Sequence, residues 1–188
     1  DQGDLKAAVE NYSMALSLNR NHLDALQNLA NALRGMAFSK PDAEIEKHII
    51  RLLEEPNYAR PKEIARAAIS LAKQKLAVLE FINNSVYELS EEDTLNKILI
   101  LSKVPLLLKL MDVCPIPDLE IESALTNLRR NILGHVRKLA STKEILNFQS
   151  SLALQCFTNE YLFIESPEET KLVKDLEKDI ERKLSSGS

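Results

Sequence analysis

Residues 3–34 read GDLKAAVENYSMALSLNRNHLDALQNLANALR. In residues 5–16 the apolar side chains recur at steps of three and four, which predicts an amphipathic helix with Asp4 as its N-cap. The polar stretch 19–21 predicts a turn, and a second apolar stripe with the same spacing occupies residues 23–36. The segment therefore predicts two antiparallel helices joined by a short turn.

Small side chains flank a large one in the first of these helices, since Ala8 and Ala15 lie on either side of Tyr12. Closely packed helix pairs need this alternation, and the segment resembles a tetratricopeptide repeat in which the second helix of one repeat runs into the first helix of the next. The resemblance implies an all-α, tetratricopeptide-like α-solenoid of helical hairpins. It also implies a helix before Asp1. We therefore expect a fragment of a longer protein with an exposed apolar edge at Leu5, through which two copies could form a homodimer.

The composition favours helices and argues against several classes of partner. The chain has 188 residues, of which 45% are hydrophobic but only 5% aromatic, and Leu, Ile and Ala favour helix over strand. A net charge of -4 gives no electrostatic reason to bind nucleic acid or an anionic membrane. Two cysteines are too few for a disulfide framework, and no apolar run is long enough to span a membrane. We therefore expect a cytoplasmic protein.

The helical pattern continues after the first hairpin. Residues 43–55 form an apolar-faced helix that stops before Pro56, and Pro61 suits the first position of the next helix, over residues 61–72. This pair predicts a second, degenerate turn of the same solenoid. The repeat pattern then fades, although the helical pattern does not.

A compact helical lobe is expected to follow. Ser90 marks a break with a helix cap, and residues 94–101 and 104–111 are so apolar that we predict them to be the most buried helices. The stretch 114–117 contains two prolines that cannot continue a helix, and it is a candidate boundary between lobes.

The remaining helices are read from their caps. Asp118 is predicted to cap a helix that runs to about residue 140. Ser141 with Glu144 is predicted to form a capping box for a helix over residues 142–163.

The last helix is predicted to begin at Ser166, with Pro167 at its first position and acidic residues in its first turn. Its apolar residues form a single stripe, and charged residues fill the other face. We divide the chain into helical hairpins (1–72), a helical lobe (73–184) and a flexible tail (185–188).

The second helix of the repeat-like segment has a polar side. By resemblance, such positions line the inner groove of tetratricopeptide proteins, which binds extended peptides or partner helices. Amide side chains both donate and accept hydrogen bonds and suit a peptide backbone, and an arginine suits a carboxylate. The solvated face of an amphipathic helix would explain the same residues equally well. The candidate groove residues are Asp24, Gln27, Asn28, Asn31 and Arg34.

Catalytic and cofactor chemistry finds little support. The four glycines are isolated, so no phosphate-binding loop is present and no cofactor is expected. Glu44 and His48 could offer two ligands, but a solvated helical pair is the commoner outcome, and no metal site is predicted. Cys156 could act as a nucleophile with His135 and Asn159, yet a buried inert thiol is far commoner in an apolar helix.

One stretch carries a local concentration of positive charge. Because the chain as a whole is acidic, we interpret this basic face as solvated surface rather than as a phosphate-binding patch. It consists of Arg129, Arg130, Arg137 and Lys138.

Residues 155–163 read QCFTNEYLF, which is too apolar and aromatic for a simple surface helix. Together with LEIESALTNLRRNIL at 119–133, this phrase resembles the helical region that precedes the catalytic domain in bacterial proteins joining tetratricopeptide repeats to an S-adenosylmethionine-dependent methyltransferase. The glycine-rich cofactor loop of that catalytic domain does not occur in this chain. A core helix with an aromatic plug would also account for the phrase.

Two functional hypotheses follow. The first is a non-catalytic scaffold of tetratricopeptide-like helices that binds a protein or peptide. The alternative is a substrate-recruiting or regulatory helical region of a methyltransferase whose catalytic domain lies outside these residues. Neither hypothesis assigns a catalytic residue to this chain.

Overall fold

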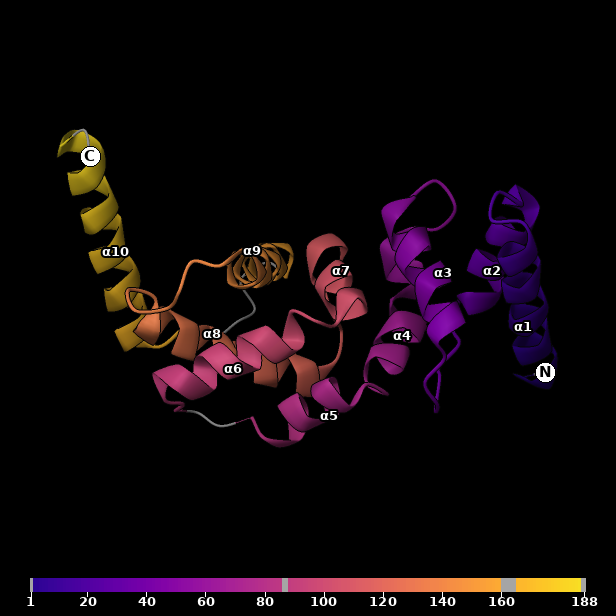
Figure 1. Ribbon diagram of the computed structural model, residues 1–188, viewed down its shortest axis with the longest axis horizontal. Coiled ribbons are helices and arrows are strands. Elements are labelled where there is room, and N and C mark those ends of the chain that lie inside the picture. Colours follow the sequence, from indigo (N-terminus) through magenta and orange to yellow (C-terminus); the bar gives the residue numbers. More distant parts are fainter. Residues whose placement is uncertain (1, 86–87, 160–164, 187–188) are drawn as a thin grey trace.

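The computed structural model describes residues 2–85, 88–159 and 165–186, with side chains from residue 4 onward. These ranges form helices joined by turns and contain no strand, which confirms the predicted all-α class (Figure 1). The helices are α1 (Gln2–Leu18), α2 (Leu23–Leu33), α3 (Ala43–Glu54), α4 (Pro61–Ala72), α5 (Leu76–Asn83), α6 (Glu91–Leu101), α7 (Pro105–Val113), α8 (Leu119–His135), α9 (Lys143–Thr158) and α10 (Pro167–Ser186).

Several helices begin where the sequence predicts. Pro61 occupies the first position of α4, where its missing N–H costs no hydrogen bond. Ser90 caps α6 by accepting a hydrogen bond from the Asp93 N–H at 3.0 Å. Asp118 caps α8 in the same way, with its carboxylate 3.0 Å from the Ile121 nitrogen.

Other helix ends differ from the prediction by one or two residues. Asp4 is not an N-cap, because α1 already begins at Gln2 and Asp4 lies in its first turn. Thr142 caps α9 instead of Ser141, accepting from the Ile145 N–H at 3.5 Å. The predicted capping box with Glu144 is therefore wrong, since the whole helix start is shifted by one residue.

Two helices also end earlier than predicted. Helix α8 stops at His135, where a turn closes by a hydrogen bond from the Lys138 N–H to the His135 oxygen at 2.8 Å. Helix α9 stops at Thr158, with Asn159 as its C-cap. The rest of the predicted helix, residues 160–163, lies outside the described residues.

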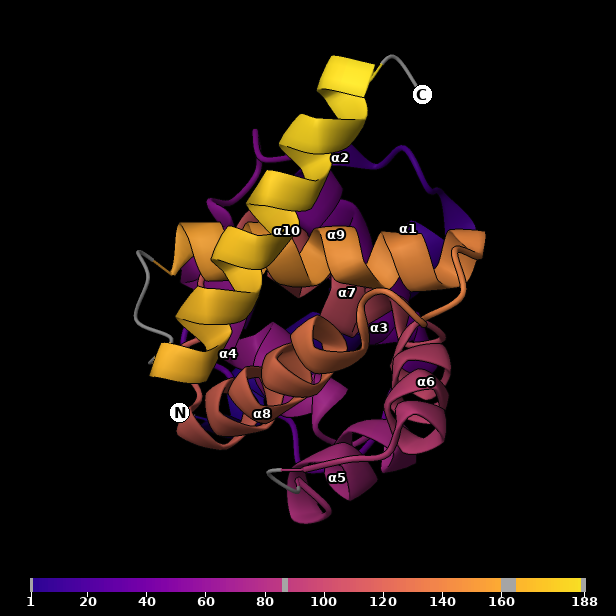
Figure 2. The same ribbon diagram turned by 90° about the vertical axis from the view of Figure 1, so that its left-hand side faces the viewer.

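Helices α1 to α4, α7 and α9 pack in a row, and helices α5, α6 and α8 form a second group beside it. Helix α1 packs on α2 and α3 on α4, and α1 also contacts α3 while α2 contacts α4. Helix α7 packs on α3 and α4 and, on its other side, on α9 (Figure 1). Helices α5, α6 and α8 contact one another, and α10 packs on α8 at the end of the molecule far from α1 (Figures 1 and 2). No helix in the described ranges is both long enough and apolar enough to cross a membrane.

Helix α7 is deeply buried. The side chains that it inserts between α3, α4 and α9 have no accessible surface. Helix α2 buries Leu26, Leu29 and Leu33 as completely, so residues 104–111 are deeply buried but are not the most buried part of the chain, as the prediction had it. For α6 the prediction is wrong, because Ile100 is 48% exposed and only one side of that helix is covered. The fully buried α7 residues are Leu106, Leu107, Leu110 and Met111.

The proline-containing connector 114–117 is pinned to the helices around it. Cys114 and Ile116 are buried. With its amide oriented to satisfy both groups, Gln155 of α9 donates to the Cys114 oxygen and accepts from the Ile116 N–H, each at 3.1 Å. The Lys73 ammonium at the end of α4 lies 2.9 Å from the Asp118 carboxylate that caps α8. The predicted division of the chain at residue 73 stays a prediction.

Replacing Leu107 by Ala should lower the free energy of unfolding by about 2–5 kcal/mol, because it leaves a cavity where α7 meets its neighbours. Urea denaturation followed by far-UV circular dichroism measures this change. The control Leu119→Ala, at a position 83% exposed, should change the free energy by less than about 0.5 kcal/mol. Equal effects of the two variants would contradict the central role of α7.

Candidate functional site

The predicted groove residues of α2 fall into two groups. Two of them bind within the chain, because the Gln27 amide donates to the Tyr58 oxygen at 3.1 Å and the Arg34 guanidinium lies 2.9 Å from the Glu63 carboxylate. Tyr58 precedes α4 and Glu63 lies in its first turn, so these contacts join α2 to α4. Gln27 and Arg34 therefore already make contacts within the chain and are less available to a ligand.

The other three groove residues are open to a ligand. Asp24, Asn28 and Asn31 are exposed, and their spacing of four and three residues places them along one line of α2. Their side chains have no hydrogen-bond partner in the described part of the chain. Together they present one carboxylate and two amides.

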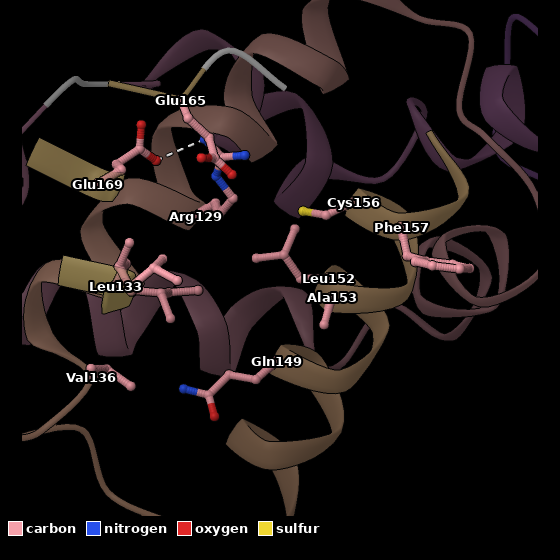
Figure 3. A pocket seen from close by; sticks show the side chains of 12 residues that line it. Arg129, Leu133, Val136, Gln149, Leu152, Ala153, Cys156, Phe157, Glu165 and Glu169 are labelled. Carbon is pink, nitrogen blue, oxygen red and sulfur yellow. Dashed lines mark hydrogen bonds and ion pairs between the residues drawn. The ribbon is translucent and has the colours of Figure 1, made fainter. Parts of the chain in front are cut away.

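A second surface feature is a cavity of about 490 Å³ between α8, α9 and α10, which we call the notch (Figure 3). It is largely apolar, and some of its lining side chains are exposed, so it opens to the surface. Phe157 on its α9 side is 67% exposed. Its apolar lining includes Leu133 of α8 and Val136 just after it, Leu152 and Ala153 from α9, and Val173 from α10.

A cluster of charges closes one end of the notch. The Glu169 carboxylate at the start of α10 is 2.7 Å from the Arg129 guanidinium (Figure 3). It is also 3.0 Å from the Arg130 guanidinium. Glu169 also accepts a hydrogen bond from the Ser166 N–H at 2.8 Å. Burial favours the neutral carboxyl, but these hydrogen bonds and the arginines outweigh it, so the pKa of Glu169 lies below its ordinary value.

The predicted basic face is therefore only partly a solvated surface. Arg129 and Arg130 are mostly buried and paired with Glu169, so the prediction is wrong for them. Arg137 and Lys138 are exposed, as predicted, although Arg137 pairs with Asp179 of α10.

The thiol of Cys156 lies in the notch without the features of a nucleophile. Its burial raises its pKa, and the nearby Arg129 guanidinium only partly offsets this effect. His135 does not line the notch, and its Nε2 is 3.0 Å from the Leu89 oxygen. Asn159 is buried, and its Nδ2 has no partner among the described atoms. The three residue types are not assembled as a catalytic group.

The Glu44 and His48 pair is no better as a metal site. Glu44 forms an ion pair with Lys47. The Nε2 atom of His48 is buried without a hydrogen-bond partner, and burial lowers the pKa of this histidine. Within the described ranges, no group of three or more His, Cys, Asp or Glu side chains could hold a metal ion.

The QCFTNEYLF phrase is split by the structure. Gln155 is buried and ties α9 to the connector, whereas Phe157 is exposed at the notch and does not plug the core. Residues 160–163 of the phrase lie outside the described residues.

Local sequence patterns predict neither the notch nor the contacts of Glu169. The pattern of Ser166, Pro167 and Glu169 predicts the start of a helix. The adjacent Arg129 and Arg130 predict a basic face. Neither local pattern predicts that this helix start and these arginines, about 40 residues apart in the sequence, form ion pairs. The available sequence signal was the pair of neighbouring arginines in one helix together with an acidic residue at the third position of another.

Replacing Glu169 by Gln should lower the free energy of unfolding at neutral pH by about 1–3 kcal/mol, because both arginines lose this carboxylate. Since the folded-state pKa lies below the ordinary value of 4.5, the stabilisation by Glu169 is complete above that value and is lost as the pH falls through the folded-state pKa. The difference between wild type and variant in urea denaturation should therefore shrink in acid. The exposed Glu177→Gln on the same helix is the control, and a difference that grows in acid would contradict the assignment.

Cys156 should alkylate more slowly than free cysteine at pH 7, because its raised pKa leaves little thiolate. Cys114 should react more slowly still, since it is buried and its pKa is raised to about 11. Iodoacetamide labelling of the native protein, read by mass spectrometry, measures both rates. Labelling of Cys156 faster than free cysteine would revive the nucleophile hypothesis.

Comparison of this chain with models of protein families, with curated proteins and with solved structures found no match in any of the three.

Proposed function

We propose that this chain is a non-catalytic scaffold of tetratricopeptide-like helical hairpins that binds an extended peptide or protein segment along α2. The observation that carries the proposal is the line formed by Asp24, Asn28 and Asn31, which are exposed and have no partner among the described residues. A helix that served only the fold would need no such aligned set of amides, although it would tolerate one.

The packing of the first four helices supports the solenoid part of the proposal. In stacked helical hairpins, each helix contacts its partner and the corresponding helix of the next hairpin. The contacts of α1 with α2 and α3, and of α2 with α4, follow this pattern. The Arg34–Glu63 ion pair joins the end of α2 to α4, and the Gln27–Tyr58 hydrogen bond joins α2 to the turn that precedes α4.

The chemistry of α2 supports a peptide as the ligand. The amides of Asn28 and Asn31 both donate and accept, so they match the alternating N–H and C=O groups of an extended backbone. Asp24 adds a negative charge at one end of the line, which favours a basic residue at that end of the peptide.

The two cysteines are free thiols, which suits the reducing cytoplasm that we propose as the location of this protein.

A displayed library of random extended peptides should yield binders whose enrichment falls at least about tenfold on Asp24→Ala/Asn28→Ala, because the variant lacks the carboxylate and one amide of the line. The matched control is Glu92→Ala/Asn96→Ala. Glu92 and Asn96 hold the same two positions on α6, which has the same length, and they are likewise exposed. Thermal unfolding of both variants should be close to that of wild type.

Arg34 is left unchanged in this test because its replacement would also break the ion pair with Glu63. Equal enrichment on wild type and on the α2 variant would contradict the proposal, as would an equal loss on the α6 control.

A further inference from the structure

Helix α10 carries an apolar stripe that its own chain leaves largely uncovered. Its N-terminal half packs on α8, but Ile180 is 56% exposed and Leu184 is 77% exposed. Figures 1 and 2 show the C-terminal half of α10 extending away from the other helices. A helix of this length spans about 30 Å, and beyond the Arg137–Asp179 ion pair its last two turns have no covering layer.

The notch lies beside the covered half of the same helix. Val173 of α10 forms one wall, and α9 forms the opposite wall with Ala153 and Phe157. The uncovered end of the stripe and the open notch therefore lie along the same helix. One copy of the chain therefore exposes both the apolar end of α10 and the open notch.

The charges of α10 specify which occupant suits this surface. Glu165 and Glu168 are exposed around its beginning. Near its end, the exposed cations Arg182 and Lys183 outnumber the exposed Glu181, although Arg182 also pairs with Asp179 of its own helix. Two such helices side by side would repel at both ends if parallel and attract at both ends if antiparallel. The apolar residues recur every four positions from Leu172 to Leu184, so the stripe reads alike in both directions.

We propose that α10 of a second copy occupies the notch, so that two copies form an antiparallel, two-fold symmetric dimer in which each inserts the end of α10 beside the start of the other. Ile180 and Leu184 of one copy then cover the notch next to Val173 of the other. Lys183 of one copy approaches Glu168 of the other. A two-fold dimer uses the same surface on both partners. Each copy can take part in this way because it carries both the exposed end of α10 and the notch.

Light scattering after gel filtration tests the apolar part of the interface. Wild type should have twice the chain mass over a concentration series, and Ile180→Asp/Leu184→Asp should have the mass of one chain. The matched control is Met14→Asp/Leu18→Asp on α1, two exposed apolar residues with the same spacing at the opposite end of the molecule. This control should remain dimeric, and circular dichroism should show that all three proteins are folded.

Ala153→Arg tests whether the notch itself is occupied. Ala153 is exposed and lines the notch, so an arginine there should block the second copy and give a monomer. A dimer that survives Ala153→Arg but not the α10 variant would mean that α10 pairs elsewhere, and the proposal would be wrong.

Charge reversal tests the antiparallel direction. Lys183→Glu should raise the dissociation constant of the dimer about tenfold, because it brings two acids together at each end. Adding Glu168→Lys should return the dissociation constant to within about threefold of wild type. A double variant no tighter than the single one would overturn the antiparallel arrangement.

Two other outcomes would overturn the proposal as a whole. The first is a wild type that is monomeric at every concentration. The second is a dimer lost in the α1 control but kept in the α10 variant, which would move the interface to the α1 edge. Peptide binding at α2 is measured separately, and the dimer variants leave α2 intact, so the two proposals can fail independently.

Discussion

Burial of α7 is the constraint on which the rest of this structure depends. Four of its side chains have no accessible surface, and they lie between the hairpin formed by α3 and α4 on one side and α9 on the other. Removal of apolar surface from water is the main favourable term in folding, so a helix covered on both sides contributes more than one that lies at the surface. The row of helices is therefore continuous through α7, although α5 and α6 intervene in the chain.

Polar contacts then set the directions of the helices that this apolar packing brings together. Lys73 ties the end of α4 to the start of α8, and Gln155 ties α9 to the connector 114–117. Glu169 joins the start of α10 to Arg129 and Arg130 of α8. A buried charge without a partner is costly, so each of these contacts disfavours other helix arrangements. The described ion pairs between α10 and the rest of the chain reach only as far as Asp179, which pairs with Arg137.

The molecule thus presents two different surfaces at its two ends. The α2 face is polar and carries unpartnered amides, which suit the backbone of an extended peptide. The notch and the outer half of α10 are apolar with charges at the ends, which suits another amphipathic helix. A dimer through α10 would place two α2 faces in one assembly. Two linked weak sites bind a repeated or dimeric partner far more tightly than one site does.

Much of the helical content was predictable, because periodicity and caps are local: Pro61, Ser90 and Asp118 begin helices as their chemistry indicates. Two of the five proposed groove residues bind within the chain, Arg34 to Glu63 of α4 and Gln27 to Tyr58 in the turn before α4. Local sequence by itself determined the all-α class, most helix starts and the amphipathic stripe of α10. Only the tertiary structure decided that α7 is central, that Glu169 meets two arginines and that the α10 stripe stays uncovered, because contacts between distant segments depend on how all the helices pack together.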